Sequence, residues 1–304
     1  MNGAPVPDAN EEYLIYQTLL GAWPLEPYSP EEFRNFIERI QAYVTKALHE
    51  AKVHTSWINP NPTYDEAVRT FVGRILDEQT NRAFLDDFRQ LQRRISHYGL
   101  FNSLSQTLVR LTAPGVPDTY QGTDLWDFSL VDPDNRRPVD YEGRGDELAE
   151  VRQRVESGRD LATFARELVA RKEDARIKLY VTWSTLAFRR DNPGLLTKGD
   201  YQPAGIVGER QENAFAFVRR HEGRVAAVAV PRMLTSLISR AGAAPMGPEV
   251  WKDTRLILPR GSWEAPLRNI FTGAELKPAA SEGNWSLPLR EVFRDFPVAV
   301  LSDV

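Results

Sequence analysis

The spacing of apolar residues changes near Tyr201, and this change limits what the chain can fold into. Before it, apolar residues recur every three or four positions, as in residues 33–48, which predicts amphipathic helices. After it, short apolar runs such as residues 214–218 and 225–230 predict strands joined by a His221-Glu222-Gly223 turn. The sequence therefore predicts helices first and an antiparallel β-sandwich after them.

The limits of further elements follow from the same patterns. Ser29 and Glu32 have the spacing of a capping box, with Pro30 at the first helical position, so a long helix is expected to begin there. The other helices are expected at about residues 11–20, 61–76, 81–95, 98–111, 146–156, 161–172 and 177–190. The other strands are expected at residues 116–120, 256–258, 263–270, 286–289 and 298–301.

A long polar stretch after the 116–120 strand is the candidate functional site. Carboxylates, amides and aromatic rings alternate in it, and this mixture suits a ligand with many hydroxyl groups. The alternative is that Arg136 and Arg137 pair with Asp132, Asp134 and Asp140 only to brace a long loop. The residues that could bind sugar or hold the loop are Asp118, Tyr120, Gln121, Asp124, Trp126, Arg136, Arg137 and Asp140.

Composition excludes several classes of function. The 304 residues carry 38 basic and 42 acidic side chains, a formal charge of −4, which gives no general attraction to nucleic acid or to an anionic membrane. No apolar run is long enough to span a bilayer, and cysteine is absent, so we expect a cytoplasmic protein. We find no metal-ligand cluster, P-loop or dinucleotide-binding glycine pattern, so no metal and no cofactor are predicted.

The stretch TAPGVPDTYQGTDLWDFSLVDPDNRRPVDY, residues 112–141, resembles the maltooligosyltrehalose synthases of the α-amylase superfamily, glycoside hydrolase family 13. Four further stretches agree: EEYLIYQTLLGAWP, TSWINPN, YGLFNSLSQTLVRL and TWSTLAFRRDNPGLL. The resemblance implies an isomerase of trehalose biosynthesis, a (1→4)-α-D-glucan 1-α-D-glucosylmutase. Such an enzyme converts the reducing-end α-1,4 bond of a maltooligosaccharide into an α,α-1,1 bond.

The resemblance also implies that this chain is the C-terminal part of the enzyme. The catalytic carboxylates of that family lie in barrel segments that precede LIYQTLLGAWP, so no catalytic residue is expected here. By the same resemblance, residues 1–97 form a helical subdomain and residues 98–200 the end of a (β/α)8 barrel with the site loop. Within the barrel part, residues 98–111 would be the seventh barrel helix and 116–120 the eighth strand. Residues 201–304 would form the C-terminal β-sandwich domain.

Three hypotheses about this chain stay open. In the first, it is a fragment that needs its N-terminal barrel part, or that associates with itself, because a lone barrel strand exposes two edges. In the second, it is a non-catalytic module that binds or scaffolds α-glucan through Trp126, Tyr120 or Trp57. In the third, it is an independent glycosidase that uses Asp118 and Asp124.

Overall fold

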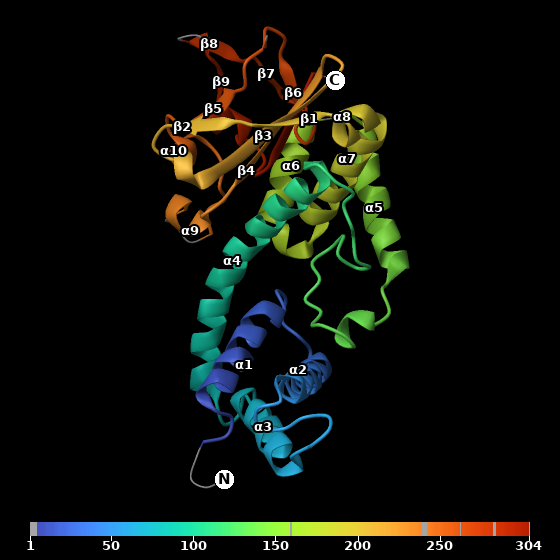
Figure 1. Cartoon of the computed structure of the whole chain (residues 1–304), viewed down its shortest axis with the longest axis vertical. Coiled ribbons are helices and arrows are strands. Elements are labelled where there is room, and N and C mark those ends of the chain that lie inside the picture. Colours follow the sequence, from blue (N-terminus) through green and yellow to red (C-terminus); the bar gives the residue numbers. More distant parts are fainter. Residues whose placement is uncertain (1–4, 159, 239–241, 262, 282–283, 304) are drawn as a thin grey trace. The chain divides into compact units, whose positions relative to one another are not determined.

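The computed structural model describes residues 5–158, 160–238, 242–261, 263–281 and 284–303, which form two compact units (Figure 1). The first unit comprises Met1–Ser96 and Asp127–Pro138. The second comprises His97–Trp126 and Val139–Val304. Each unit has its own hydrophobic core.

The first unit is helical. It contains α1 (Ala9–Ala22), α2 (Pro30–Ala51), α3 (Pro62–Ile75), the first part of α4 (Arg82–Thr112) and the 3-10 turn η1 (Asp134–Arg136). The capping box predicted for α2 is confirmed, because the Ser29 hydroxyl accepts from the Glu32 N–H and the Glu32 carboxylate accepts from the Ser29 N–H. The fully buried core residues include Ile15, Leu19, Phe36, Ile40, Val44, Val72 and Leu85.

The prediction of separate helices at residues 81–95 and 98–111 is wrong, because α4 runs through both without a break. The intervening residues include no proline, and the lone Gly99 lowers helix stability by only about 1 kcal/mol relative to alanine. Apolar residues such as Leu104, Leu108 and Leu111 are buried along the later part of the helix. Burial of that face stabilises the helix by more than the glycine costs.

The second unit combines helices with two antiparallel sheets. Its helices are α5 (Tyr141–Glu156), α6 (Leu161–Ala170), η2 (Lys172–Asp174), α7 (Arg176–Asp191), α8 (Pro193–Thr197), η3 (Gln211–Asn213), α9 (Leu234–Leu237), α10 (Pro248–Trp251) and α11 (Leu289–Val292). One sheet has the order β1 (Asp200–Pro203), β3 (Ala214–His221), β4 (Arg224–Pro231), β10 (Ala299–Ser302), β6 (Leu267–Asn269) and β7 (Glu275–Leu276). The other has the order β2 (Gly205–Val207), β5 (Arg255–Leu258), β9 (Asn284–Pro288) and β8 (Ala279–Ser281).

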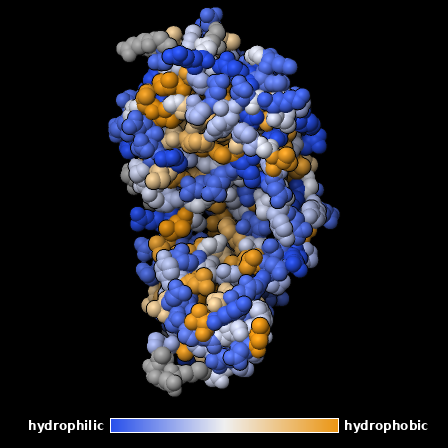
Figure 2. Space-filling model, in the orientation of Figure 1, coloured by the Kyte–Doolittle hydropathy of each residue, from blue (hydrophilic) through white to orange (hydrophobic). Residues whose placement is uncertain are grey.

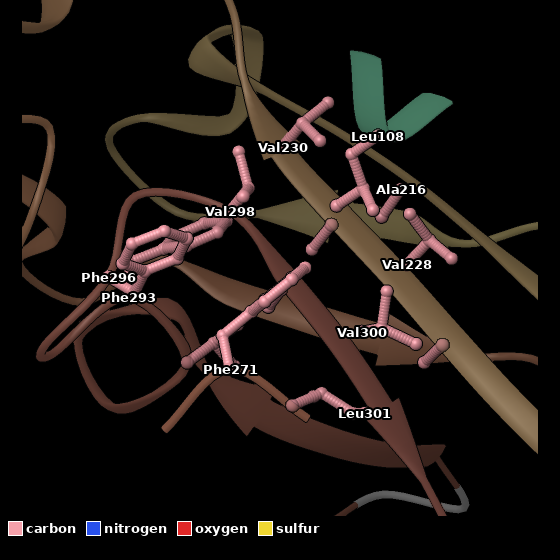
Figure 3. Packing of buried hydrophobic residues seen from close by; sticks show 14 of the residues in the cluster. Leu108, Ala216, Val228, Val230, Phe271, Phe293, Phe296, Val298, Val300 and Leu301 are labelled. Carbon is pink, nitrogen blue, oxygen red and sulfur yellow. The ribbon is translucent and has the colours of Figure 1, made fainter. Parts of the chain in front are cut away.

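The antiparallel pairing predicted after Tyr201 is confirmed. His221 lies opposite Arg224, so the β3–β4 hairpin turns through Glu222 and Gly223, both at positive φ, as a two-residue primed turn requires. In the core of this unit, Leu108 of α4 lies near Ala216 and Val228 of the larger sheet (Figure 3), and the rings of Phe271 and Phe296 have centres 5.3 Å apart. The last turns of α4 are thus anchored on the sheet.

The strand predicted at residues 116–120 is not formed in this chain. No described segment pairs with it, and the Val116 side chain is 96% exposed. A strand is stabilised by hydrogen bonds to a neighbouring strand, and without one the local sequence preference does not suffice. The segment therefore has no regular secondary structure in this chain.

The visible face of the molecule carries both polar and apolar residues (Figure 2). Figure 2 shows hydrophobic residues scattered among hydrophilic ones on the visible face of the molecule. Ile58 and Val116 are the most exposed of the large apolar side chains described. No helix in the described parts of the chain is both long and apolar enough to cross a membrane.

Candidate functional site

The connection between α4 and α5 contains every predicted site residue, of which the last, Asp140, is the N-cap of α5. Residues 113–126, called here the first loop half, belong to the second unit. Asp127–Pro138, the second loop half, belong to the first unit. The two halves are held in different ways.

The first loop half begins at a helix end fixed by two arginines. Arg219 is 1% exposed, and its guanidinium donates to the carbonyl oxygens of Thr112, Gly199 and Asp200 at 2.8, 2.9 and 3.2 Å. Arg189 donates to the Leu111 oxygen at 3.0 Å. Cations at a helix C-terminus complement its exposed carbonyl groups. Burial, and then the positive charge of Arg189, lower the pKa of Arg219.

Cationic side chains also hydrogen-bond to the backbone of the first loop half along its length. Each donates to a carbonyl oxygen, and Arg110 and Arg144 also contact the side chains of Thr119 and Asp124. The contacts are Arg189 to Gly115 at 3.0 Å, Arg110 to Asp118, Arg144 to Gly122 at 3.3 Å, and Lys178 to Leu125 at 2.9 Å. The loop is therefore positioned through its main chain.

Asp118 and Tyr120 are exposed on the first loop half. Within the described residues, the Asp118 carboxylate has no hydrogen-bond or ion-pair partner, and the Tyr120 side chain is 48% exposed. Gln121 is also exposed, although it makes an interaction within the chain. A free carboxylate beside a phenol ring can accept hydrogen bonds from sugar hydroxyls and contact a sugar face.

Asp124 and Trp126 are engaged within the chain. The Asp124 carboxylate lies 3.1 Å from Nε of Arg144. The Trp126 indole N–H donates to the Lys172 oxygen at 2.7 Å, and Nζ of Lys178 lies 5.4 Å from the centre of the indole ring. Both residues brace the first loop half.

The second loop half is held by carboxylates instead. Asp134 accepts two hydrogen bonds of 2.9 Å from Arg39 of α2, and its other contacts are the Leu130 N–H and Arg137. Burial alone would raise the pKa of Asp134, but the hydrogen bonds and the positive charges of these arginines lower it below the ordinary value. Arg137 therefore braces the loop.

Arg136 and Asp140 have structural contacts too. Arg136 pairs with Asp132, whose carbonyl oxygen also accepts from Lys46 of α2. The Asp140 carboxylate accepts from the Gly143 N–H at 3.0 Å and so caps α5. The Tyr141 side chain that follows is exposed.

The cations that hold the loop were missed by the sequence reading. Arg39, Arg110, Arg144, Arg189 and Arg219 lie on helices or a strand, and Arg39 is 95 positions from its partner Asp134. The only signal available was that several basic residues on these elements have no acidic neighbour at helical spacing. This pattern does not identify the residue with which each cation pairs.

One cluster that could ligate a metal was also missed. Among the described residues, Asp8, Glu11 and His54 bring one ligand atom each within 4.8 Å of one another. Each group has another role: Asp8 caps α1 and contacts His54 at 2.9 Å, while Glu11 accepts from Tyr64 and from the Asp8 N–H. The geometry is that of a capping network.

Comparison with known proteins gives a consistent relationship. No family model matches the chain. A putative maltooligosyl trehalose synthase of Mycobacterium tuberculosis is 33% identical over 298 residues, which is 98% of this chain and 32% of that protein. The solved maltooligosyltrehalose synthase of Arthrobacter ramosus is 30% identical with a TM-score of 0.71, over 99% of this chain and 33% of that one. A glycosyltrehalose synthase described as DSM5389 is 26% identical with a TM-score of 0.65, over 99% and 32%.

The chain thus spans about a third of the length of the relatives that it matches. The sheets and helices described above extend through the whole matched region. Over nearly its whole length, the chain is homologous to the C-terminal part of the maltooligosyl trehalose synthases.

Proposed function

We propose that this chain contributes the C-terminal part of an isomerase that converts the reducing-end α-1,4 bond of a maltooligosaccharide into an α,α-1,1 bond. The similarity to proteins named as maltooligosyl trehalose synthases supports this type of reaction. The catalytic carboxylates would come from the N-terminal barrel part, so this chain alone would be inactive. Its partners are that barrel part and the maltooligosaccharide, in the cytoplasm.

One observation carries the role of the site. Asp118 and Tyr120 are exposed, and Asp118 is without a partner among the described residues, on a segment whose backbone is held at four carbonyl groups. Fixed backbone with free side chains is the arrangement that sugar binding needs, because little ordering is left to occur on binding. Asp118 would accept hydrogen bonds from sugar hydroxyls, and Tyr120 would contact a ring face.

Retaining chemistry of this kind needs two carboxyl groups about 5 to 5.5 Å apart, one as nucleophile and one as proton donor. Asp118 would bind the substrate beside such a pair rather than belong to it. Water must be excluded so that the released glucose, and not water, is the acceptor. The loop would contribute to that exclusion by forming one wall of the cavity.

The finer fold assignment is part of the same proposal. Residues 98–200 would be the end of a (β/α)8 barrel between a helical subdomain, 1–97, and a β-sandwich domain, 201–304. Residues 116–120 would form the eighth strand only where preceding barrel segments supply its neighbours. In their absence, exposed residues such as Val116 would favour self-association.

The test is incubation of the purified chain with maltopentaose, with and without the N-terminal part added in trans. We expect loss of reducing ends, with little free glucose, only after complementation. Loss of reducing ends or release of glucose by the chain alone would overturn the proposal and favour catalytic carboxylates within the loop. No activity after a complex has demonstrably formed would also overturn it.

A non-catalytic α-glucan-binding module is the second candidate. The observation in its favour is the Trp57 indole, which is 61% exposed and so open to stacking on a sugar. Binding of maltopentaose by the complemented complex without turnover, and its loss in Trp57→Ala, would support this candidate. Turnover would reject it.

A further inference from the structure

A cavity lies entirely within the helical unit, and no residue of the α4–α5 loop lines it. It has a volume of about 540 Å³, within the range of small-ligand pockets. Its walls are the connection between α1 and α2, the start of α2, and one face of α4. The lining residues that bear on a ligand are Trp23, Tyr28, Phe33, Gln92 and Arg93, with an Arg89–Glu78 pair beside them.

Two buried polar groups in this cavity lack partners. Gln92 is 4% exposed and Trp23 is 7% exposed, and no described residue hydrogen-bonds to the Gln92 amide or to the Trp23 indole N–H. Neither group is among the unpaired polar atoms that are completely enclosed by protein. Their polar ends therefore reach the cavity. Since no described residue satisfies these groups, both are available to hydrogen-bond a ligand in the cavity.

Aromatic rings supply the other half of a binding site. Phe33 and Tyr28 are half-buried in the wall, and the Phe33 ring meets the Trp23 ring edge-on with centres 6.0 Å apart. The Arg89 guanidinium lies 5.9 Å from the centre of the Trp23 ring, so a sugar would compete with a cation for that face of the indole. The open aromatic surface is that of Phe33 and Tyr28.

The charge of the lining indicates a neutral ligand. Glu26 and Glu78 are matched by Arg89 and Arg93, so the formal charges of the lining residues cancel. A neutral ligand that presents both C–H faces and hydroxyl groups uses the rings and the amide together. An anionic ligand would leave the carboxylates unfavourably placed.

We propose that this cavity is a second binding site for a neutral α-linked glucan, one or a few glucose units of the same chain class that the loop serves. This inference rests on the proposed function for the choice of glucan. Gln92 and the Trp23 N–H bind hydroxyl groups, Phe33 and Tyr28 contact a sugar face, and Arg93 contacts hydroxyls at the rim. The site retains the substrate without taking part in bond exchange.

The experiment titrates the full 304-residue chain with maltotriose while following the indole N–H signals by NMR. Trp23→Phe assigns the Trp23 signal. We expect that signal to shift, and Phe33→Ala and Gln92→Ala each to weaken binding about tenfold. Tyr13→Ala is the matched control, an exposed ring of the same unit outside the cavity, and it should leave the titration unchanged.

Two results would overturn the inference: no shift of the Trp23 signal, or unchanged affinity in both Phe33→Ala and Gln92→Ala. If a variant fails to fold, Arg93→Ala at the exposed rim gives the same test. Isomerisation without cavity binding would reject this inference alone, and cavity binding without isomerisation would reject only the proposed function.

Discussion

Both loop halves contain aspartates, but the carboxylates of these aspartates have different surroundings. In the first, cations hold backbone carbonyl groups, and Asp118 and Tyr120 are left exposed. In the second, the carboxylate of Asp134 is itself the acceptor for arginines and is largely buried. An aspartate of this loop is therefore free for a ligand or braces the chain according to whether a cation pairs with its carboxylate.

The largest effect is expected at the start of the first loop half. Arg219→Met removes a buried donor set and leaves the Thr112, Gly199 and Asp200 carbonyl groups unsatisfied. We expect the free energy of unfolding to fall by about 3 to 4 kcal/mol, measured by urea titration. Arg190→Met, an exposed pair on α7, is the control and should change it by less than about 0.5 kcal/mol. A loss below about 1 kcal/mol for Arg219→Met would show that α4 does not depend on this anchor.

Breaking the anchor of the second loop half should cost somewhat less. Arg39→Met removes two hydrogen bonds to Asp134 and one to the Phe128 oxygen from a largely buried pair. The expected loss is about 2 to 3 kcal/mol, with strong coupling in a double-mutant cycle with Asp134→Asn. Arg82→Met, which disrupts only an exposed pair in the same unit, is the control. Additive effects of Arg39→Met and Asp134→Asn would contradict the bracing role.

Arg144→Met sharpens the comparison within the first loop half. It removes contacts with the Gly122 and Asp140 oxygens and frees the Asp124 carboxylate. We expect about 1 to 2 kcal/mol of destabilisation, because the pair is partly exposed. A loss of sugar binding without a loss of stability would assign Arg144 to the ligand instead.

The dependence of stability on pH should differ between the two units. The folded pKa of Asp134 is lowered, so its stabilisation is present above the unfolded value of 3.8 and is lost as pH falls through the lower folded value. The folded pKa of Glu147 is raised from 4.5, because burial and the charge of Asp174 outweigh the nearby arginines. Its contribution is therefore present below the unfolded value and is lost as pH rises through the folded one.

Unfolding titrations from about pH 6 to about pH 3 test both signs. In Asp134→Asn, the free energy of unfolding should fall less steeply as the pH is lowered. In Glu147→Gln, the free energy of unfolding should be slightly higher than in the parent chain at about pH 6. If the free energy of unfolding changed with pH equally steeply in the parent chain and in Asp134→Asn, the electrostatic account of the second loop half would be rejected.

Local features of the fold could be predicted from sequence, whereas distant partners could not. The α2 capping box and the Glu222-Gly223 turn depend on residues a few positions apart, so their patterns are visible in the chain. The continuity of α4 depends on burial of its later face, which outweighs Gly99. The 116–120 strand depends on a neighbour that no described segment supplies.

The site shows the same limit. The polar loop was located from its composition, but its division into free and bracing residues depends on Arg39, Arg144 and Arg189, which come from separate helices. Asp118 and Asp134 are therefore the same type of residue in different surroundings. Only the three-dimensional contacts distinguish them.

Asp118→Asn provides the most direct test of this difference. The chain should keep its free energy of unfolding within about 0.5 kcal/mol, since Asp118 has no described side-chain partner. After complementation with the N-terminal part, conversion of maltopentaose should fall about tenfold or more, because a charged acceptor for sugar hydroxyls is lost. Unchanged conversion, or a fall in stability as large as that of Asp134→Asn, would contradict the assignment of Asp118 to binding.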